Sequence, residues 1–344
     1  MVAMHHAQYD ASAVAARMGQ PFSYSKLLPW TAGVDIFFVI SGFIMVYASA
    51  DLFGRRDGPR LFLERRIARI VPIYWAVTTL FLLIALIAPS AINSAAPSVW
   101  QVVASYLFIP TTGADGHVQP VYTLGWTLNY EMFFYVLFAL AIVLKRAQAV
   151  VAVAAMLLLF VVVRPFAAPL SPTLAFWGDP IVLEFVFGML LGLMRTRGVS
   201  LPFAVRLILA AAAVVLLHFD LVRSDAPLPL PAIVAYGVPA AMLVAAAAFD
   251  RDSETSWRFE RPLAALGDAS YALYLVHPFA IRVLRELVLA LGAGALLGPW
   301  VFVGVALVLA VAAALAVYRL FERPTTQALR TAMAAQRLKA RYTE

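Results

Sequence analysis

Apolar blocks, each about as long as a bilayer is thick, constrain this chain more than any other feature. Hydrophobic residues make up 63% of the 344 residues and charged residues only 13%, whereas soluble domains carry roughly 25% charged residues. Because lipid offers no hydrogen bonds to the backbone, each block must be a helix. The expected fold is therefore all-α, a polytopic transmembrane helix bundle. We predict nine complete spans, at residues 33–50, 71–89, 124–144, 148–163, 180–194, 202–219, 230–249, 264–288 and 299–321.

The net charge of +7 indicates membrane topology rather than a nucleic-acid partner. If the segment after the first complete span is cytoplasmic, most of the arginines and lysines also fall on the cytoplasmic side, as the positive-inside rule requires. The C-terminus is then cytoplasmic as well. We expect a single integral-membrane domain over residues 1–344, in which residues 325–344 form a basic, helical cytoplasmic tail on the anionic membrane surface.

Residues 1–8 resemble the last turns of a hydrophobic helix. Nine spans that end in a cytoplasmic tail place residue 1 outside, and no signal peptide precedes it in the sequence. We interpret these residues as the remnant of a truncated first helix, with a short mobile N-terminus as the alternative.

Three ionisable residues, Asp35, Glu131 and His277, lie within the predicted spans. An ionisable group in hydrocarbon costs about 2.5–3.5 kcal/mol on insertion scales, so such groups are functional candidates. Glu131 also belongs to a stripe with Thr123, Thr127 and Tyr135 at four-residue spacing, which should face the bundle interior. For Glu131 and His277 a purely structural role in helix packing is the alternative. Gly188 and Gly192 form a small-xxx-small pair that predicts a close helix approach.

Several kinds of chemistry are excluded. The chain has no cysteine, so it can form no disulfide, thiol nucleophile or thiolate metal site. No phosphate-binding loop, HExxH pair or dinucleotide fingerprint occurs in the sequence. We expect no metal.

Five segments, in this order, resemble the signature of membrane acyltransferase family 3. They are residues 33–43, 65–72, 125–131, 270–278 and 321–324. The resemblance extends over nearly the whole chain and is strongest to the branch that acetylates exopolysaccharides, typified by succinoglycan acetylation. It implies transfer of an acetyl group from cytoplasmic acetyl-CoA to a sugar hydroxyl at or across the bacterial inner membrane. The family pattern begins with an arginine about eleven residues before a histidine; His6 matches that histidine, and the arginine has no counterpart here.

Acyl transfer to a hydroxyl needs a base, and imidazole has a suitable pKa near working pH. We predict that His6 is this base and that Asp35 orients its ring, as an acid does in a catalytic dyad. Glu131 and His277 are further catalytic candidates. The alternative is that Asp35 only caps a helix N-terminus and that His6 has no role.

The donor's phosphates call for arginine, because a guanidinium binds phosphate oxygens in bidentate fashion. Arg66 and Arg69 lie three residues apart on one helical face, and Arg65 is placed to assist them. The alternative is that they belong only to the basic flank of a span. The expected partners are acyl-CoA, a carbohydrate acceptor, membrane lipid and polysaccharide-synthesis proteins.

Two other functions fit the same pattern of buried charges. A transporter or flippase of lipid-linked sugar would need no acyl donor, and a regulatory membrane protein would carry a degenerate site. The acyl group, the acceptor hydroxyl, a covalent intermediate and the oligomeric state stay open from the residues alone.

Overall fold

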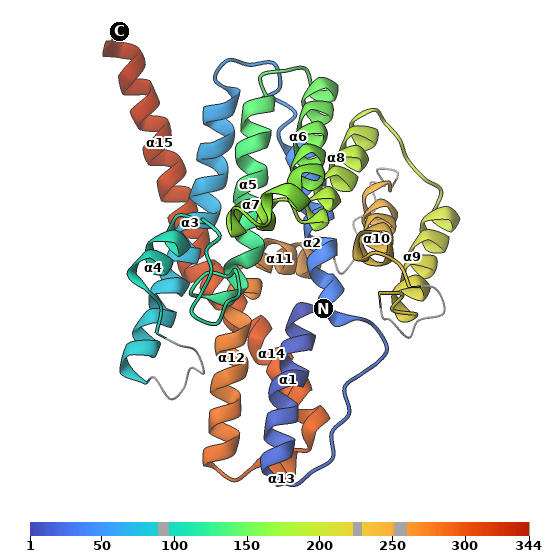
Figure 1. The fold of residues 1–344 in the computed structure, drawn as a ribbon, viewed down its shortest axis with the longest axis vertical. Helices are drawn as coiled ribbons and strands as arrows, with labels where there is room; N and C mark the ends of the chain where they lie inside the picture. The colour runs from blue at the N-terminus through green and yellow to red at the C-terminus, as the bar shows by residue number, and fades with distance from the viewer. Residues whose placement is uncertain (89–95, 223–228, 251–259, 344) are drawn as a thin grey trace. The chain divides into compact units, whose positions relative to one another are not determined.

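The computed structural model describes residues 1–343 except 89–95, 223–228 and 251–259 (Figure 1). Within these described residues every regular element is a helix, and the one β-pairing is an isolated bridge between Thr112 and Val118. The all-α prediction is therefore confirmed for this part of the chain. The chain divides into two compact units. Unit 1 comprises Met1–Gly33 and Asp252–Ala328, and unit 2 comprises Val34–Arg251 and Leu329–Glu344.

Unit 1 is built around three helices that pack side by side (Figure 1). They are α1 (Val2–Arg17), α12 (Ser270–Ala290) and α14 (Pro299–Val317). Their core combines small residues, which let the helices approach closely, with larger ones that fill the space: Ala7, Ala11, Val14, Ile281, Val288, Phe302, Val303 and Ala306. The shorter elements of this unit are η1 (Trp30–Ala32), α11 (Glu260–Asp268), α13 (Gly294–Leu297) and the π-helix η6 (Tyr318–Glu322), which leads into α15 (Arg323–Thr343).

Unit 2 contains most of the remaining helices. The elements are α2 (Gly33–Ala48), α3 (Gly58–Ile87), α4 (Val99–Tyr106), η3 (Thr123–Gly125), α5 (Trp126–Ala141), α6 (Arg146–Ala167), α7 (Pro172–Trp177), η4 (Pro180–Val182), α8 (Leu183–Thr196), α9 (Phe203–His218), the π-helix η5 (Ile233–Gly237) and α10 (Val238–Ala248). In the order of their packing, α3 contacts α5, α5 contacts α6, α6 contacts α8, α8 contacts α10, and α10 contacts α9.

Glycines bring α2 and α8 together. A Cβ added at Gly188 would collide with the carbonyl oxygen of Val39, and one at Gly192 would lie 2.9 Å from the carbonyl oxygen of Phe43. On α2, Gly42 makes the reciprocal approach to the backbone of Phe185. Without side chains at these positions, two helix backbones can come into direct contact. The predicted close approach at Gly188 and Gly192 is confirmed.

Five helical segments of the described chain are long and apolar enough to cross a membrane. They are Trp30–Ala48, Gly58–Ile87, Thr123–Ala141, Arg146–Ala167 and Pro299–Arg337. Phe203–His218 and Ile233–Ala248 are shorter apolar helices. The predicted span at 180–194 is the 14-residue helix α8, and the one at 264–288 is divided between α11 and α12. The structure thus supports a membrane helical bundle, while the number nine stays a prediction.

The structure corrects two predicted helix boundaries. Residues 1–8 are not the end of a helix, because α1 continues to Arg17; the following alanine-rich turns favour helix and bury Ala11 and Ala15. Helix α3 begins at Gly58, well before Pro72, which lies inside it. The arginines before Pro72 therefore belong to the same helix as the apolar span. Residues 325–344 were predicted to be helical, and α15 confirms this through Thr343.

Candidate active site

Two histidines face each other in unit 1. The rings of His6 on α1 and His277 on α12 have centroids 5.1 Å apart and an interplanar angle of 62°. The packing of Ala7 and Ile281 in the core beside them fixes this approach. Both residues were predicted from the sequence as catalytic candidates, but their proximity to one another was not predicted.

The hydrogen bonding of His277 defines which ring nitrogen is available. Its side chain is almost fully buried, and Nδ1 lies 2.9 Å from the carbonyl oxygen of Leu273. A carbonyl oxygen can only accept, so Nδ1 carries the proton and Nε2 carries the lone pair. Among the described residues Nε2 is buried and has no hydrogen-bond partner. A neutral imidazole with a free Nε2 lone pair can act as a general base.

An ion pair one turn along α1 holds the two histidine helices in register. Nη1 of Arg285 on α12 donates to a carboxylate oxygen of Asp10 at 2.9 Å, and both side chains are largely buried. Asp10 is four residues after His6, so it lies on the same helical face. This ion pair was not predicted, although the four-residue spacing of Asp10 from His6 was a usable signal.

Glu131 is the centre of a polar cluster in unit 2. Ser41 Oγ on α2 donates to Glu131 Oε1 at 2.6 Å, and Tyr135 Oη on α5 donates to the same oxygen at 2.5 Å. The carboxylate is buried, and Arg66 and Arg69 of α3 lie within electrostatic range of it. Three of the segments that carried the family resemblance therefore meet here. The predicted interior stripe is confirmed for Thr127, Glu131 and Tyr135, which are buried. It is wrong for Thr123, which is exposed because it lies in the short η3 turn before α5 begins.

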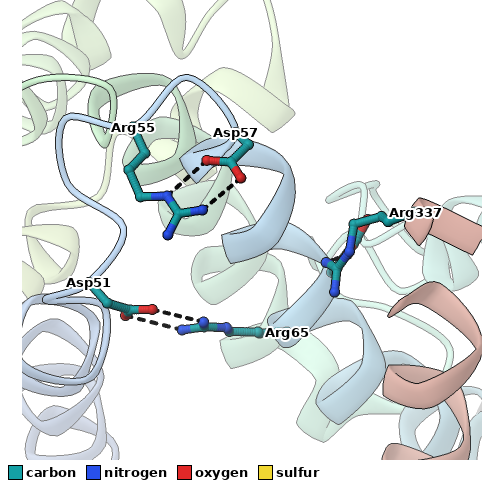
Figure 2. A network of polar contacts seen from close by, with 6 residues as sticks. Asp51, Arg55, Asp57, Arg65 and Arg337 are labelled. Carbon is teal, nitrogen blue, oxygen red and sulfur yellow. Dashed lines mark hydrogen bonds and ion pairs between the residues drawn. The ribbon is translucent and has the colours of Figure 1, made fainter. Parts of the chain in front are cut away.

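The three donor-site arginines have different surroundings. Arg65 makes an exposed bidentate ion pair with Asp51 at 3.0 and 3.3 Å (Figure 2). Its charge and hydrogen bonds lower the pKa of the Asp51 carboxyl below the usual range. Arg66 lies over the ring of Phe62, and its Nε is buried without a hydrogen-bond partner among the described residues. No ion pair is recorded for Arg66 or Arg69 in this part of the chain. These two guanidiniums retain the donors that a phosphate would need.

Asp35 lies in the first turn of α2, and its carboxyl group neighbours that of Glu184 on α8. Both side chains are buried. Two carboxylates close together in a buried site repel each other strongly, so this pair requires a shared proton or a cationic or hydroxylic neighbour. The pairing was not predicted. Because His6 belongs to the other unit, the predicted orientation of His6 by Asp35 stays a prediction.

No group of three or more histidine, aspartate or glutamate side chains that could hold a metal ion occurs among the described residues.

Residues 1–319 match the protein family described as "Acyltransferase domain". The chain therefore belongs to this acyltransferase family, as the motif resemblance predicted, and it is an enzyme that transfers acyl groups.

Two curated proteins are similar to this chain. The exopolysaccharide production protein ExoZ of Rhizobium meliloti (strain 1021) is 35% identical over 265 residues, which cover 77% of this chain and 80% of ExoZ. The acyltransferase MdmB of Streptomyces mycarofaciens is 31% identical over 278 residues, which cover 72% of this chain and 67% of MdmB. No solved structure matches the chain.

Proposed function

We propose that this enzyme is an integral-membrane O-acetyltransferase of carbohydrates. It would transfer the acetyl group of cytoplasmic acetyl-CoA to a hydroxyl of an exopolysaccharide or another cell-surface sugar, at or across the bacterial inner membrane. Family membership supports acyl transfer, and similarity to ExoZ, an exopolysaccharide production protein, supports an exopolysaccharide acceptor. The five apolar helical segments support the membrane location. The positive-inside distribution of arginine and lysine supports a cytoplasmic C-terminus. Polysaccharide-synthesis proteins are the expected partners, because ExoZ is an exopolysaccharide production protein.

The observation that carries the proposal is the ring contact between half-buried His6 and buried His277, in which His277 Nε2 has a free lone pair. In the proposed reaction a histidine of this pair removes the proton of the sugar hydroxyl. The hydroxyl oxygen then attacks the thioester carbonyl carbon, and the carbon–sulfur bond breaks. The imidazolium returns its proton to the leaving CoA sulfur, so the protein ends in its starting state. We keep His6 as the base, with His277 as its neighbour and Asp35 as the sequence-based candidate for orienting it.

The donor would bind through Arg66 and Arg69. The buried, unpartnered Nε of Arg66 fits a phosphate oxygen, since guanidinium and phosphate form strong charge-assisted hydrogen bonds. Arg65 would contribute charge once its exposed pair with Asp51 opens. Glu131, hydrogen-bonded by Ser41 and Tyr135, lies on the neighbouring helix and would stabilise the packing beside this end of the site.

Acetyl-CoA binding to the purified protein in detergent tests the proposal by calorimetry. We expect saturable binding, and we expect the double variant Arg66→Ala/Arg69→Ala to lose it. Arg56→Ala is the matched control, because Arg56 is an exposed arginine of the same flank and should bind donor like the unchanged protein.

Absence of binding to folded protein would contradict the proposal and favour a transporter of lipid-linked sugar. Binding that survives in the double variant would support acetyl-CoA as the donor but show that Arg66 and Arg69 do not form its binding site. Transfer of radiolabelled acetyl to exopolysaccharide, compared between the unchanged enzyme and His6→Ala, tests the base independently.

A further inference from the structure

Within unit 2, the second half of α15 lies against the first turns of α3. Between them is a cavity of about 190 Å³ lined by Leu61, Glu64, Arg65, Arg330, Met333 and Arg337. Leu61 and Arg65 are four residues apart, and Arg69 continues the same face of α3 beyond them. The cavity is therefore the start of a surface that leads along α3 to the predicted donor arginines.

The carboxylate of this cavity already has cationic partners. Glu64 forms an ion pair with Arg337 of α15 and accepts a hydrogen bond from Arg60 at 2.8 Å. Arg65 is paired with Asp51 at 3.0 Å. Arg60, Arg65 and Arg337 therefore each have a carboxylate partner, although the three guanidiniums share only the two carboxylates of Glu64 and Asp51.

Arg330 is different. No ion pair or hydrogen bond of its guanidinium is recorded among the described residues, and the positive charges of Arg65, Arg66 and Arg69 act on it. Like charges held together cost free energy, and a concentrated positive potential attracts anions. Arg330 lines the cavity and lies within electrostatic range of Arg66 and Arg69 further along α3. None of the three forms an ion pair among the described residues, and the Glu131 carboxylate is the acidic group within range of Arg66 and Arg69.

The apolar part of the cavity suggests what kind of anion fits. Leu61 and Met333 are both partly buried, and a flexible methionine packs well against flat aromatic groups. A site with an apolar wall beside several guanidiniums suits a phosphorylated nucleotide better than inorganic phosphate, because a base can cover the wall while the phosphates meet the arginines.

We propose that the cavity between α3 and α15 binds the nucleotide end of the acyl-CoA donor, with Arg330 contacting the 3′-phosphate. Arg66 and Arg69, further along α3, then meet the pyrophosphate. This inference rests on the proposed function, since it needs a CoA thioester as donor. It adds a binding residue from the C-terminal helix, a segment that the sequence marked only as a basic tail.

The test compares acetyl-CoA with 3′-dephospho-acetyl-CoA, which differs by the one phosphate. Calorimetry on the full chain should show that the unchanged protein prefers acetyl-CoA by about tenfold, which corresponds to about 1.4 kcal/mol, because the 3′-phosphate makes a charge-assisted contact. Arg330→Gln should lose this preference, because its affinity for acetyl-CoA falls while its affinity for 3′-dephospho-acetyl-CoA stays the same. Arg330→Lys should retain part of the preference. Arg330 is exposed, so neither substitution should affect folding. Arg56→Gln, on the same flank, should keep the full preference.

Separate outcomes overturn separate claims. If the unchanged protein binds neither acetyl-CoA nor 3′-dephospho-acetyl-CoA, the proposed function and this inference both fail. If it binds both thioesters, and Arg330→Gln still prefers the one with the 3′-phosphate, only the inference fails. The measurement is repeated in nanodiscs of phosphatidylcholine with and without phosphatidylglycerol. An Arg330→Gln defect that appears only with the anionic lipid would assign Arg330 to a lipid headgroup and also overturn the inference.

Discussion

His277 in unit 1 and Glu131 in unit 2 are both buried polar side chains on predicted spans, but their hydrogen bonding differs. Glu131 Oε1 accepts two hydroxyl hydrogen bonds from its own unit. His277 uses Nδ1 for a main-chain carbonyl and leaves Nε2 without a partner in the described chain.

This difference separates two uses of a buried polar group. A buried acceptor that receives its hydrogen bonds from the protein stabilises packing. Removing it leaves the donors buried without an acceptor, which costs folding free energy. A buried acceptor left without a partner costs stability and is retained where a substrate group completes the bond. We therefore expect His277 to affect activity most and Glu131 to affect stability most.

The largest effect should come from the histidines. His6→Ala should lower acetyl transfer by about 10²–10⁴-fold, the contribution of a general base. His277→Gln should also lower it strongly, because the His277 ring lies against that base. The thermal unfolding temperature in detergent should change little. Activity is measured as transfer of labelled acetyl to exopolysaccharide.

His117→Ala is the control for the histidines, because His117 is exposed in a loop and should leave the rate unchanged. If His277→Gln is fully active while His6→Ala is inactive, His277 is a packing residue and the comparison with Glu131 no longer holds.

Glu131→Ala should show the opposite pattern. It leaves the hydroxyls of Ser41 and Tyr135 without their acceptor, which costs about 1–3 kcal/mol for a buried group. The unfolding midpoint should fall, and the residual rate should follow the amount of folded protein. Ser41→Ala/Glu131→Ala in combination should recover part of the loss, because one unpaired partner is removed with the acceptor. A variant that stays fully stable but loses acetyl transfer would place Glu131 in the chemistry.

The smallest effect should come from the exposed pair of Arg65 and Asp51. The folded pKa of Asp51 lies below its usual value because of the Arg65 hydrogen bonds and charge. The pair therefore contributes stability above the unfolded aspartate pKa of about 3.9, and this contribution disappears as the pH falls through the lower folded value.

Solvent screens this pair, so its contribution should be small. The measurement is the difference in unfolding temperature between the unchanged protein and Asp51→Asn from pH 7 to pH 3. The difference should shrink towards acid pH. A large difference at pH 7 would show that the turn before α3 matters more for stability than its exposure indicates.

Much of this arrangement follows from the sequence, because hydrophobic blocks and short motifs are local signals. The helical class, the contact at Gly188 and Gly192, and the shared face of Glu131 and Tyr135 were predicted and are confirmed. Each depends on spacing within one helix or on the absence of a side chain.

The partners of buried groups were harder to predict. The pairs His6 with His277, Asp10 with Arg285 and Asp35 with Glu184 each join residues far apart in the chain. Which helix faces which is decided by tertiary packing, and periodicity within one segment carries no information on it. The boundary of α1 was missed for a related reason, since its later turns are only moderately apolar and are stabilised by burial against α12 and α14.

Helix α3 carries the donor arginines and an apolar span on one continuous rod. Its 30 residues correspond to about 45 Å of helix. If one end of the helix is held in place, rotating the helix axis by about 5° displaces the other end by about 4 Å. Beyond the arginines, Tyr74 of the same helix lies so close to Gly125 that a Cβ there would be 2.7 Å from the ring. Pro72 lacks the amide hydrogen that would complete the ladder between these points. We therefore expect a ligand that binds the arginines to bend α3 at Pro72 and so to shift Tyr74 against the segment before α5.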